Sequence, residues 1–206
     1  KEREEGYLVM ATRKGLIKKT GSDEFANLRK MGLIAIALRE DDELIGVELT
    51  QGSSELMLAP RMGQAIRFSE SDVRPMGRNS MGVRSIDLAE GDEVIDVAKV
   101  EEGKQVLAIT QNGYGKRTDI SEFRAQSRGG KGILAMRLTE KTGLMAAQRL
   151  VSEHEDVMLI TDNGTIIRMP VDDISVIGRV SQGVRVMRVE DEGRIVGVTA
   201  TERDED

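Results

Sequence analysis

The chain has 206 residues, of which 39% are hydrophobic, so it can bury one or two cores, and no apolar run approaches the roughly 18 residues that a membrane helix needs. It has no cysteine, which excludes disulfides and thiol chemistry and fits a reducing cytoplasm. The formal net charge of −6 opposes binding to nucleic acid over the whole surface, but seven acidic residues lie in the stretch from Glu190 to Asp206.

Taken in order, the chain shows an internal repeat of about 50 residues, a period typical of stacked repeat architectures. One register of glycines comprises Gly15, Gly63, Gly113 and Gly164, which lie 48, 50 and 51 residues apart. A second register comprises Gly32, Gly82, Gly132 and Gly183, at separations of 50, 50 and 51. We place four repeats at 7–54, 55–104, 105–155 and 156–201, followed by an acidic tail at 202–206.

Each repeat reads as four short strands. Asn112-Gly113 predicts a two-residue type I′ hairpin between the first and second strands, because both central residues of that turn need positive φ. We expect third strands at Leu33–Arg39 and Val184–Val189, and a fourth strand such as Val94–Val100. No long helical period occurs, so the pattern predicts an all-β, propeller-like domain with little helix. Two separate β-domains of two repeats each remain the alternative.

The loop between the second and third strands carries basic residues in every repeat. Residues 112–137, which contain the third loop, have six basic and two acidic side chains. Stacked repeats would present these loops as a row of positive charge, which favours a polyanion such as duplex DNA, held through its phosphates with weak sequence preference. The alternative for any one loop is a solvated turn. Phe25, Val73, Phe123 and Ile174 are expected to anchor these loops in the core.

Catalytic and metal-binding interpretations find little support. The glycines after Arg128 do not form a phosphate-binding P-loop, because Ala125 and Gly132 stand where that motif needs Gly and Ser or Thr. His154, the only histidine, lies in a predicted turn between repeats. The acidic turns recur at every hairpin, which is typical of solvated strand ends. We therefore expect no catalytic residue, no metal site and no cofactor.

Gln126–Gly132, with the sequence QSRGGKG, resembles the GyrA box, Q-[RK]-R-G-G-[RK]-G, of the C-terminal domains of the A subunit of DNA gyrase. The segments GLIAIALREDDELIGVELT, GRNSMGV, GYGKRT and GRVSQGVR resemble later repeats of that family, so the likeness covers nearly the whole chain. It implies a β-pinwheel, a six-bladed relative of the propeller that exchanges strands between blades and wraps DNA around a basic rim.

Two departures from the family pattern qualify the resemblance. The box has Ser127 where a basic residue is usual, and it lies in the third of four repeats, whereas the family's main box lies in the first blade. We therefore expect a fragment that lacks about two preceding blades, in which this box is a secondary one. Such a fragment should leave an open sheet edge.

The resemblance further implies a DNA-binding and DNA-wrapping domain without chemistry of its own. The parent would be a bacterial, cytoplasmic and nucleoid-associated ATP-dependent type II topoisomerase whose catalytic tyrosine, ATP and Mg²⁺ lie elsewhere. Its partners would be duplex DNA and, in a heterotetramer, the rest of gyrase A and the gyrase B protein, with no membrane. The alternatives are the C-terminal domain of the A subunit of topoisomerase IV and a propeller-like protein-interaction module.

The candidate DNA-binding residues follow from the box and from the equivalent loops. Arg128 and Lys131 are expected to contact phosphates, Gly129, Gly130 and Gly132 to allow close backbone approach, and Gln126 to fix the loop beside Ser127. The track would be extended by Lys116, Arg117, Arg29, Lys30, Arg78, Arg84, Arg179 and Arg185.

Overall fold

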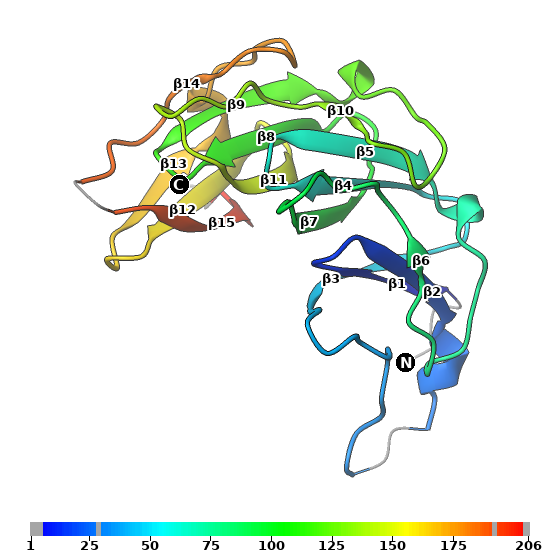
Figure 1. The fold of residues 1–206 in the computed structure, drawn as a ribbon. Helices are drawn as coiled ribbons and strands as arrows, with labels where there is room; N and C mark the ends of the chain where they lie inside the picture. Colours follow the sequence, from blue (N-terminus) through cyan, green and yellow to red (C-terminus); the bar gives the residue numbers. More distant parts are fainter. Residues whose placement is uncertain (1–5, 28–29, 191–192, 204–206) are drawn as a thin grey trace. The chain divides into compact units, whose positions relative to one another are not determined.

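The computed structural model describes residues 6–27, 30–190 and 193–203, and its strands form four small sheets (Figure 1). The first sheet has the order β3 (Leu44–Thr50), β1 (Tyr7–Thr12), β2 (Leu16–Gly21), β6 (Val83–Arg84). The second has the order β10 (Ile133–Leu134), β5 (Gln64–Ser69), β4 (Glu55–Pro60), β7 (Val94–Lys99). The third has the order β11 (Met145–Val151), β8 (Gln105–Thr110), β9 (Tyr114–Asp119), β14 (Val184–Arg185). The fourth has the order β13 (Ile166–Pro170), β12 (Glu155–Thr161), β15 (Ile195–Glu202).

Helix is limited to single 3-10 turns in the part of the chain that the structure describes, which confirms the all-β prediction. These turns follow the second strand of each repeat and comprise η1 (Ser22–Phe25), η2 (Glu70–Asp72), η3 (Ile120–Glu122) and η4 (Val171–Asp173). No helix in the described ranges is long and apolar enough to span a bilayer.

The chain divides into two compact units whose boundaries do not coincide with the repeats. The first contains the described residues up to Leu58, together with Ile66–Val100 and Ala125–Gly132. The second contains Ala59–Ala65, Glu101–Arg124 and the described residues from Ile133 onwards. The third-repeat loop that carries the box therefore belongs to the first unit.

The hairpins have a different turn from the predicted one. The N–H of Gly113 donates to the carbonyl of Thr110 at 3.1 Å, so the turn is centred on Gln111 and Asn112, and the Gly113 φ is +83°. A turn followed by a glycine of positive φ is the three-residue hairpin loop, whereas the Asn-Gly pair had predicted a two-residue type I′ loop. The glycine is required, but one position later in the turn than expected.

The predicted third strands are mostly wrong in length. The stretch Leu33–Arg39 is not strand, and Val184–Val189 is reduced to the two residues of β14. The two-residue strands β6, β10 and β14 pair antiparallel with the second strand of the preceding repeat, as in the pairs of Arg84 with Leu16 and Arg185 with Tyr114. Each of these short strands is thus exchanged between successive repeats. The fourth strand, β7 at Val94–Lys99, is confirmed.

The fourth sheet has three strands, and within the described ranges no segment pairs with the outer edge of β13. The side chain of Ile166 in this strand is 62% exposed. A Cβ built on Gly164, in the preceding turn, would meet nothing within 4 Å. At Gly113, the equivalent turn in the third repeat, a Cβ would overlap the carbonyl oxygen of Met187 from the next repeat. The expected open edge therefore lies at β13.

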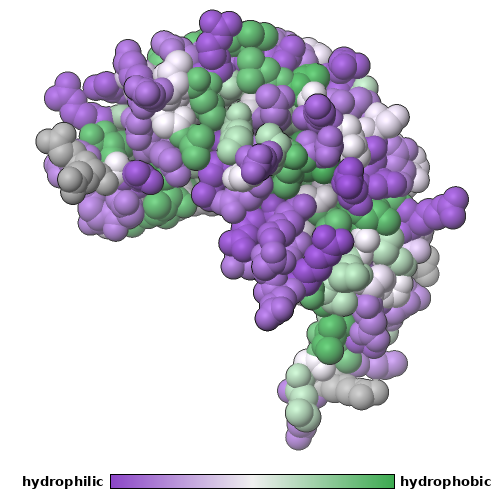
Figure 2. Space-filling view, viewed as in Figure 1, coloured by the Kyte–Doolittle hydropathy of each residue, from purple (hydrophilic) through white to green (hydrophobic). Residues whose placement is uncertain are grey.

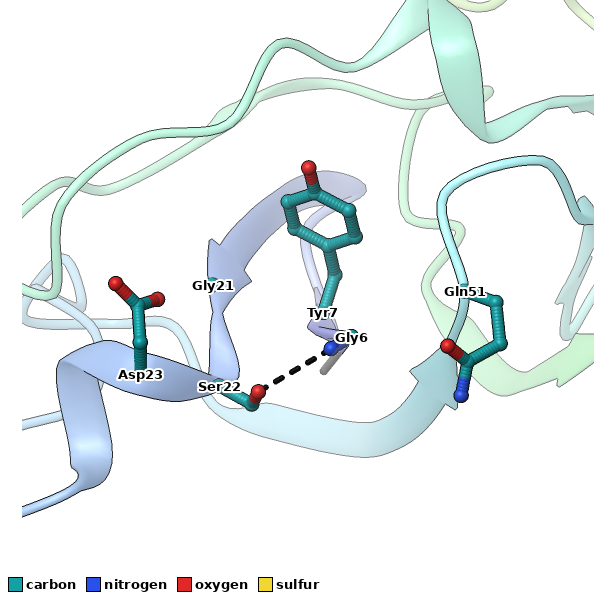
Figure 3. Close-up of a pocket in the computed structure, with 6 residues that line it drawn as sticks. All are labelled: Gly6, Tyr7, Gly21, Ser22, Asp23 and Gln51. Atoms are coloured by element: carbon teal, nitrogen blue, oxygen red, sulfur yellow. Dashed lines mark hydrogen bonds between the residues drawn. The ribbon is translucent and has the colours of Figure 1, made fainter. Parts of the chain in front are cut away.

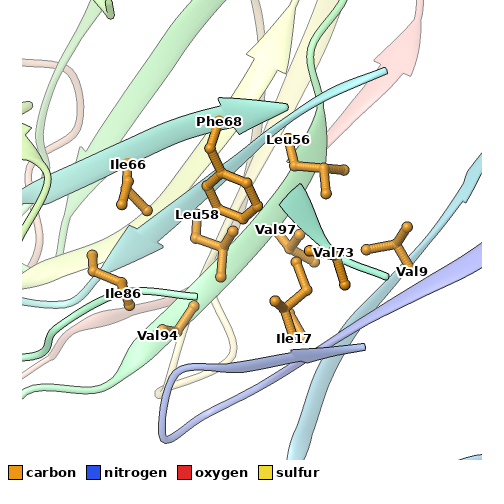
Figure 4. Close-up of a cluster of buried hydrophobic side chains, with 11 residues drawn as sticks. Val9, Ile17, Leu56, Leu58, Ile66, Phe68, Val73, Ile86, Val94 and Val97 are labelled. Atoms are coloured by element: carbon orange, nitrogen blue, oxygen red, sulfur yellow. The ribbon is translucent and has the colours of Figure 1, made fainter. Parts of the chain in front are cut away.

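Each unit has its own apolar core. In the first unit the cluster comprises Val9, Ala11, Ile17, Leu56, Leu58, Ile66, Phe68, Val73, Ile86, Val94 and Val97 (Figure 4). In the second it comprises Leu107, Ile109, Ala147, Val151, Val157, Leu159, Val171, Ile174, Met187, Ile195 and Val198. The predicted anchors Val73, Phe123 and Ile174 are buried, whereas Phe25 is half-buried. Val73 and Ile174 directly follow a 3-10 turn, so the cores fix the start of the loops that carry the basic residues.

Replacing Gly113 by alanine should destabilise the chain more than replacing Gly164 by alanine. Their φ angles are +83° and +86°, so both changes carry a similar backbone cost of about 1–2 kcal/mol. Only at Gly113 does the added Cβ also overlap the backbone of the next repeat, which should cost about 2 kcal/mol more. Urea unfolding of both variants measures this difference. Equal losses would contradict the described contact between the third and fourth repeats.

Candidate nucleic-acid interface

The basic loops are each built by two successive repeats. We call residues 74–82, 124–132 and 175–183 the rim loops of the second, third and fourth repeats. The backbone of each rim loop donates one hydrogen bond to the second strand of the preceding repeat: Met76 to Lys19 (2.8 Å), Gln126 to Arg67 (2.9 Å) and Ile177 to Arg117 (2.8 Å). The corresponding first-repeat loop contains Arg29, which lies outside the described residues, and Lys30, which is exposed.

One arginine occupies the same position in every rim loop, namely Arg78, Arg128 and Arg179. Its guanidinium donates to a backbone carbonyl at an equivalent position of the preceding repeat: Arg78 to Ile34 (3.2 Å), Arg128 to Arg84 and Arg179 to Leu134. Arg128 also donates from Nε to the carbonyl of Asp72 at 3.1 Å. Three predicted contact residues therefore tie neighbouring repeats together.

Each of these loops also contacts a carboxylate from the 3-10 turn of the preceding repeat. The backbone N–H of Arg179 donates to Glu122 at 2.8 Å, and that of Arg128 lies 3.3 Å from the Asp72 carboxylate. In the second rim loop the Arg78 guanidinium lies 3.8 Å from Glu24. These acids neutralise part of the positive charge of each loop, so the shared arginines contribute less net charge than their number suggests.

The glycines that end the second and fourth rim loops pack against the preceding repeat. A Cβ on Gly82 would lie 2.5 Å from the carbonyl oxygen of Ile17, and one on Gly183 would lie 2.6 Å from that of Gly115. Gly132, at the equivalent position in the box, has a φ of +75°. Close approach to the neighbouring repeat is thus one reason for this glycine, independent of any ligand.

Two predicted contact residues, Lys116 and Arg117, are inside the protein. Lys116 is fully buried and donates from Nζ to the carbonyls of Gly178 at 2.9 Å and Arg179 at 2.5 Å. Arg117 is 5% exposed and donates from Nε to the carbonyl of Ile174 at 2.7 Å. Neither side chain offers its charge at the surface. Both instead hold the fourth rim loop in place.

The remaining predicted residues differ in how accessible their charge is. Lys131 is exposed. Arg84 is also exposed, at 68% of its side chain, and lies 3.6 Å from Asp87. Arg185 donates to the hydroxyl of Tyr114 at 2.9 Å, and its guanidinium lies 5.4 Å from the ring centroid, which lowers the pKa of the Tyr114 hydroxyl. Lys131 is therefore the box residue best placed to contact an anion.

The other box residues are arranged around this lysine. Ser127 is exposed. Gly129 has a φ of +85°, whereas the φ of Gly130 is not positive. A Cβ on Gly130 would make only ordinary contacts, at 3.5 Å or more. The side-chain nitrogen of Gln126 is buried and has no hydrogen-bond partner within the described ranges. Its backbone N–H donates to the carbonyl of Arg67 at 2.9 Å, a bond that does not depend on the glutamine side chain.

Four exposed arginines were missed as contact residues when the sequence was considered alone. Arg74 and Arg124 are the first residues of the second and third rim loops, and Arg137 and Arg188 follow the third and fourth. Each pair is separated by one repeat, 50 and 51 residues respectively, which is the signal that could have found them. Within the part of the chain that the structure describes, none of the four forms an ion pair. They are the freest cations near the rim loops.

A pocket at the start of the first unit does not suit an anionic ligand. It is lined by Gly6, Tyr7, Gly21, Ser22, Asp23 and Gln51, with Ser22 Oγ accepting a hydrogen bond from the N–H of Gly6 (Figure 3). Its only charged lining side chain is the carboxylate of Asp23. Figure 2 shows that hydrophilic residues predominate on the face in view, with hydrophobic residues in small groups. No metal-binding cluster of His, Cys, Asp or Glu occurs within the described ranges.

The sequence matches a family model described as the DNA gyrase C-terminal domain, beta-propeller, over residues 6–51, 62–101, 104–147 and 155–202. Among curated proteins, the A subunit of DNA gyrase from Halalkalibacterium halodurans is 57% identical over 203 residues, which is 98% of this chain and 24% of that protein. The A subunit of DNA gyrase from Escherichia coli is 45% identical over 198 residues, which is 96% of this chain and 23% of that protein. The chain thus spans about a quarter of these relatives.

Two solved structures share the fold. The crystal structure of the C-terminal domain of DNA topoisomerase IV matches with a TM-score of 0.91 and 30% identity, over 96% of this chain and 62% of that one. The structure of the DNA gyrase A C-terminal domain matches with a TM-score of 0.86 and 28% identity, over 96% of this chain and 66% of that one. These matches confirm the propeller-like pinwheel fold.

The buried Lys116 should give the stability of the chain a specific pH dependence. Burial lowers the pKa of its ammonium from 10.5 to about 8, with Glu122 opposing the shift and Arg179 adding to it. Between these two values the unfolded chain holds a proton that the folded chain has lost, so the free energy of unfolding rises with pH. We expect this increase in the free energy of unfolding with pH to be absent in K116M.

Urea unfolding of the wild type and K116M at pH 7.5 and pH 9.5 tests this expectation. The difference between the two proteins isolates Lys116, because all other titrating groups are common to both. The wild type should gain stability relative to K116M at the higher pH. Parallel behaviour of the two proteins would show that Lys116 keeps an ordinary pKa.

Proposed function

Because the chain belongs to the family of DNA gyrase C-terminal domains, we propose that it binds duplex DNA through its rim loops and bends it without performing chemistry itself. In this role it supports negative supercoiling by DNA gyrase, an ATP-dependent type II topoisomerase of the bacterial cytoplasm. The catalytic tyrosine, ATP and Mg²⁺ would then belong to other parts of the enzyme. The parent assembly would contain the rest of gyrase A and the gyrase B protein.

The strongest support is the recurrence of unpaired cations at equivalent positions of successive repeats. Arg74 and Arg124 lie 50 residues apart, Arg137 and Arg188 lie 51 residues apart, and all four are exposed. Repeated phosphate contacts are what bending needs, since bending a site of 20–30 base pairs costs on the order of 1–6 kcal/mol. Contacts of this type hold the backbone and read no bases.

Glycines near a phosphate would add to these contacts, because they leave backbone amides accessible. Gly129 and Gly130 directly precede Lys131, which is exposed. We therefore assign the direct phosphate contacts of this loop to Lys131, Arg124 and the second terminal nitrogen of Arg128.

The C-terminal domain of the A subunit of topoisomerase IV remains a second candidate. Its solved relative has the higher TM-score of the two compared structures, 0.91 against 0.86. The high identity to gyrase A proteins over nearly the whole chain favours gyrase. A propeller that binds protein partners would use the same charges only for solubility and would not bind DNA.

Removing Arg124 and Lys131 together should weaken DNA binding in a salt-dependent way. If each neutralises one phosphate, the R124A/K131A double variant should lower the slope of log affinity against log salt by about 1.8. Electrophoretic shifts with a short duplex over a salt series measure the slope. K104A is the matched control, because Lys104 pairs with Glu101 at 3.1 Å in a turn between strands, away from the rim loops. An unchanged slope in the double variant would remove these residues from the interface.

Wrapping, as distinct from binding, should appear as a change in DNA topology. We expect a nicked circular DNA sealed by ligase in the presence of this chain to acquire a different linking number, because a curved path is fixed before closure. Two-dimensional agarose gels resolve the topoisomers. If DNA is bound but the linking number stays that of the protein-free control, the chain contacts DNA without wrapping it.

A further inference from the structure

The second strands of the repeats differ at one position in a regular way. The residue three places after the hairpin glycine is Lys18 in the first repeat and Lys116 in the third, but Ile66 in the second and Ile167 in the fourth. All except Ile167 are fully buried, and Ile167 lies on the open edge strand β13. A buried lysine in two of four equivalent positions needs a reason, because burying an ammonium is costly unless hydrogen bonds satisfy it.

The rim loop of the fourth repeat satisfies the ammonium of Lys116. Its Nζ donates to the carbonyls of Gly178 (2.9 Å), Arg179 (2.5 Å) and Ser181 (3.2 Å), and it lies 3.2 Å from the hydroxyl of Ser181. The same turn is closed by hydrogen bonds from the N–H and hydroxyl of Ser181 to the carbonyl of Gly178 at 3.2 and 2.9 Å. The Gly-Arg-x-Ser turn therefore directs its carbonyls inward onto the lysine.

Lys18 makes one equivalent contact with the rim loop of the second repeat, at Arg78, and a second contact within its own repeat. Its Nζ donates to the carbonyl of Ala35 at 2.6 Å and to that of Arg78. This loop has the same Gly-Arg-x-Ser sequence, and the N–H of Ser80 donates to the carbonyl of Gly77 at 3.2 Å. Both lysines thus hold the arginine of the next rim loop through its own backbone carbonyl.

For the rim loop that carries the box, the position of the lysine is occupied by Ile66, and the turn is held by a different hydrogen bond. The N–H of Gly129 donates to the carbonyl of Ser85 at 2.8 Å, and Ser85 is equivalent to Ala35, whose carbonyl accepts from Lys18. The glycine φ of +85° allows this approach. A backbone amide of the loop therefore replaces the lysine ammonium, and a Ser-Arg-Gly-Gly sequence replaces Gly-Arg-x-Ser.

From this correspondence we propose that Lys18 and Lys116 are positioning residues, which fix the rim loop of the following repeat so that its arginine and its neighbours meet DNA in a set geometry. The part of the proposal that concerns DNA rests on the proposed function. The interface then contains two kinds of loop, one held by a buried ammonium and one closed by glycine. The arginines held in this way are Arg78 and Arg179, while Arg128 belongs to the glycine-closed loop.

The charges that face each lysine are consistent with this role. Glu122 and Arg179 face Lys116, and Glu24 and Arg78 face Lys18. In both cases the acid comes from the 3-10 turn of the lysine's own repeat and the arginine from the loop that is held. Burial lowers the pKa of both ammonium groups. The hydrogen bonds of both ammonium groups are therefore formed in a buried site, where a hydrogen bond is stronger than in water and each one has a large effect on loop conformation.

Hydrogen exchange of K18M and K116M, followed by mass spectrometry, tests the proposal on the 206-residue chain. Methionine keeps the length of the side chain and removes the ammonium. K116M should speed amide exchange in 177–183 by about tenfold or more and leave 76–82 and 126–132 unchanged. K18M should do the same for 76–82 alone, so each variant is the control for the other. A purely structural role would instead speed exchange throughout the unit.

A second measurement on the same proteins decides the DNA part. K116M should weaken binding to a short duplex several-fold while keeping the salt slope of the wild type, because the buried ammonium contacts no phosphate. Unchanged exchange in 177–183 would overturn the proposal. Faster exchange with unchanged DNA affinity would overturn the positioning role in DNA binding. If the wild type bound no DNA, the proposed function would fail, and the exchange data would still decide whether the lysines hold the loops.

Discussion

The structure depends on one backbone hydrogen bond that recurs between successive repeats. The carbonyl of the hairpin glycine accepts from the next repeat at 2.8 Å in three places: from Ser85 to Gly15, from Ala135 to Gly63 and from Val186 to Gly113. Side-chain identity does not matter to this bond, so the donors can be serine, alanine or valine. It fixes the far end of each rim loop on the preceding repeat, and the exchanged two-residue strand follows from it. The conformation of a basic loop in this fold therefore depends on contacts from two successive repeats.

This joint construction explains why cations near the rim loops divide into two classes. A cation that points toward the following repeat finds carbonyls left by the irregular loop backbone and is retained inside, as Lys116 and Arg117 are. A cation that points outward meets solvent and keeps its charge accessible, as Lys131 and Arg124 do. Buried polar groups must be hydrogen-bonded, and a loop that makes few ladder hydrogen bonds of its own has carbonyls that an ammonium can satisfy. Lysines and arginines at neighbouring positions thus have two different roles: the buried ones join the repeats, and the exposed ones carry surface charge.

The sequence predicted the architecture well and the site less well, for a common physical reason. The scarcity of helix and the fourth strand at Val94–Lys99 follow from local sequence patterns, and both were predicted correctly. The partner of β6 was not predicted, because a two-residue strand has no period of its own. Lys116 was assigned to the surface because lysine is almost never fully buried unless it is paired. Only the carbonyls of Gly178 and Arg179, 62 and 63 residues away, make its burial possible.

The box motif itself has more than one physical cause. Glycines in a basic loop are ordinarily explained by close approach to phosphate, and that explanation fits Gly130, where a side chain would meet no obstacle within the protein. Gly129 and Gly132 have internal reasons, since both need positive φ and the N–H of Gly129 bonds to Ser85. Ile66, at the position equivalent to Lys18 and Lys116, has no ammonium to supply, and the Gly129 N–H takes this place. Part of the motif is therefore explained by the contacts of the loop with the neighbouring repeat. Only the remaining residues, above all Lys131, are left to be explained by a ligand.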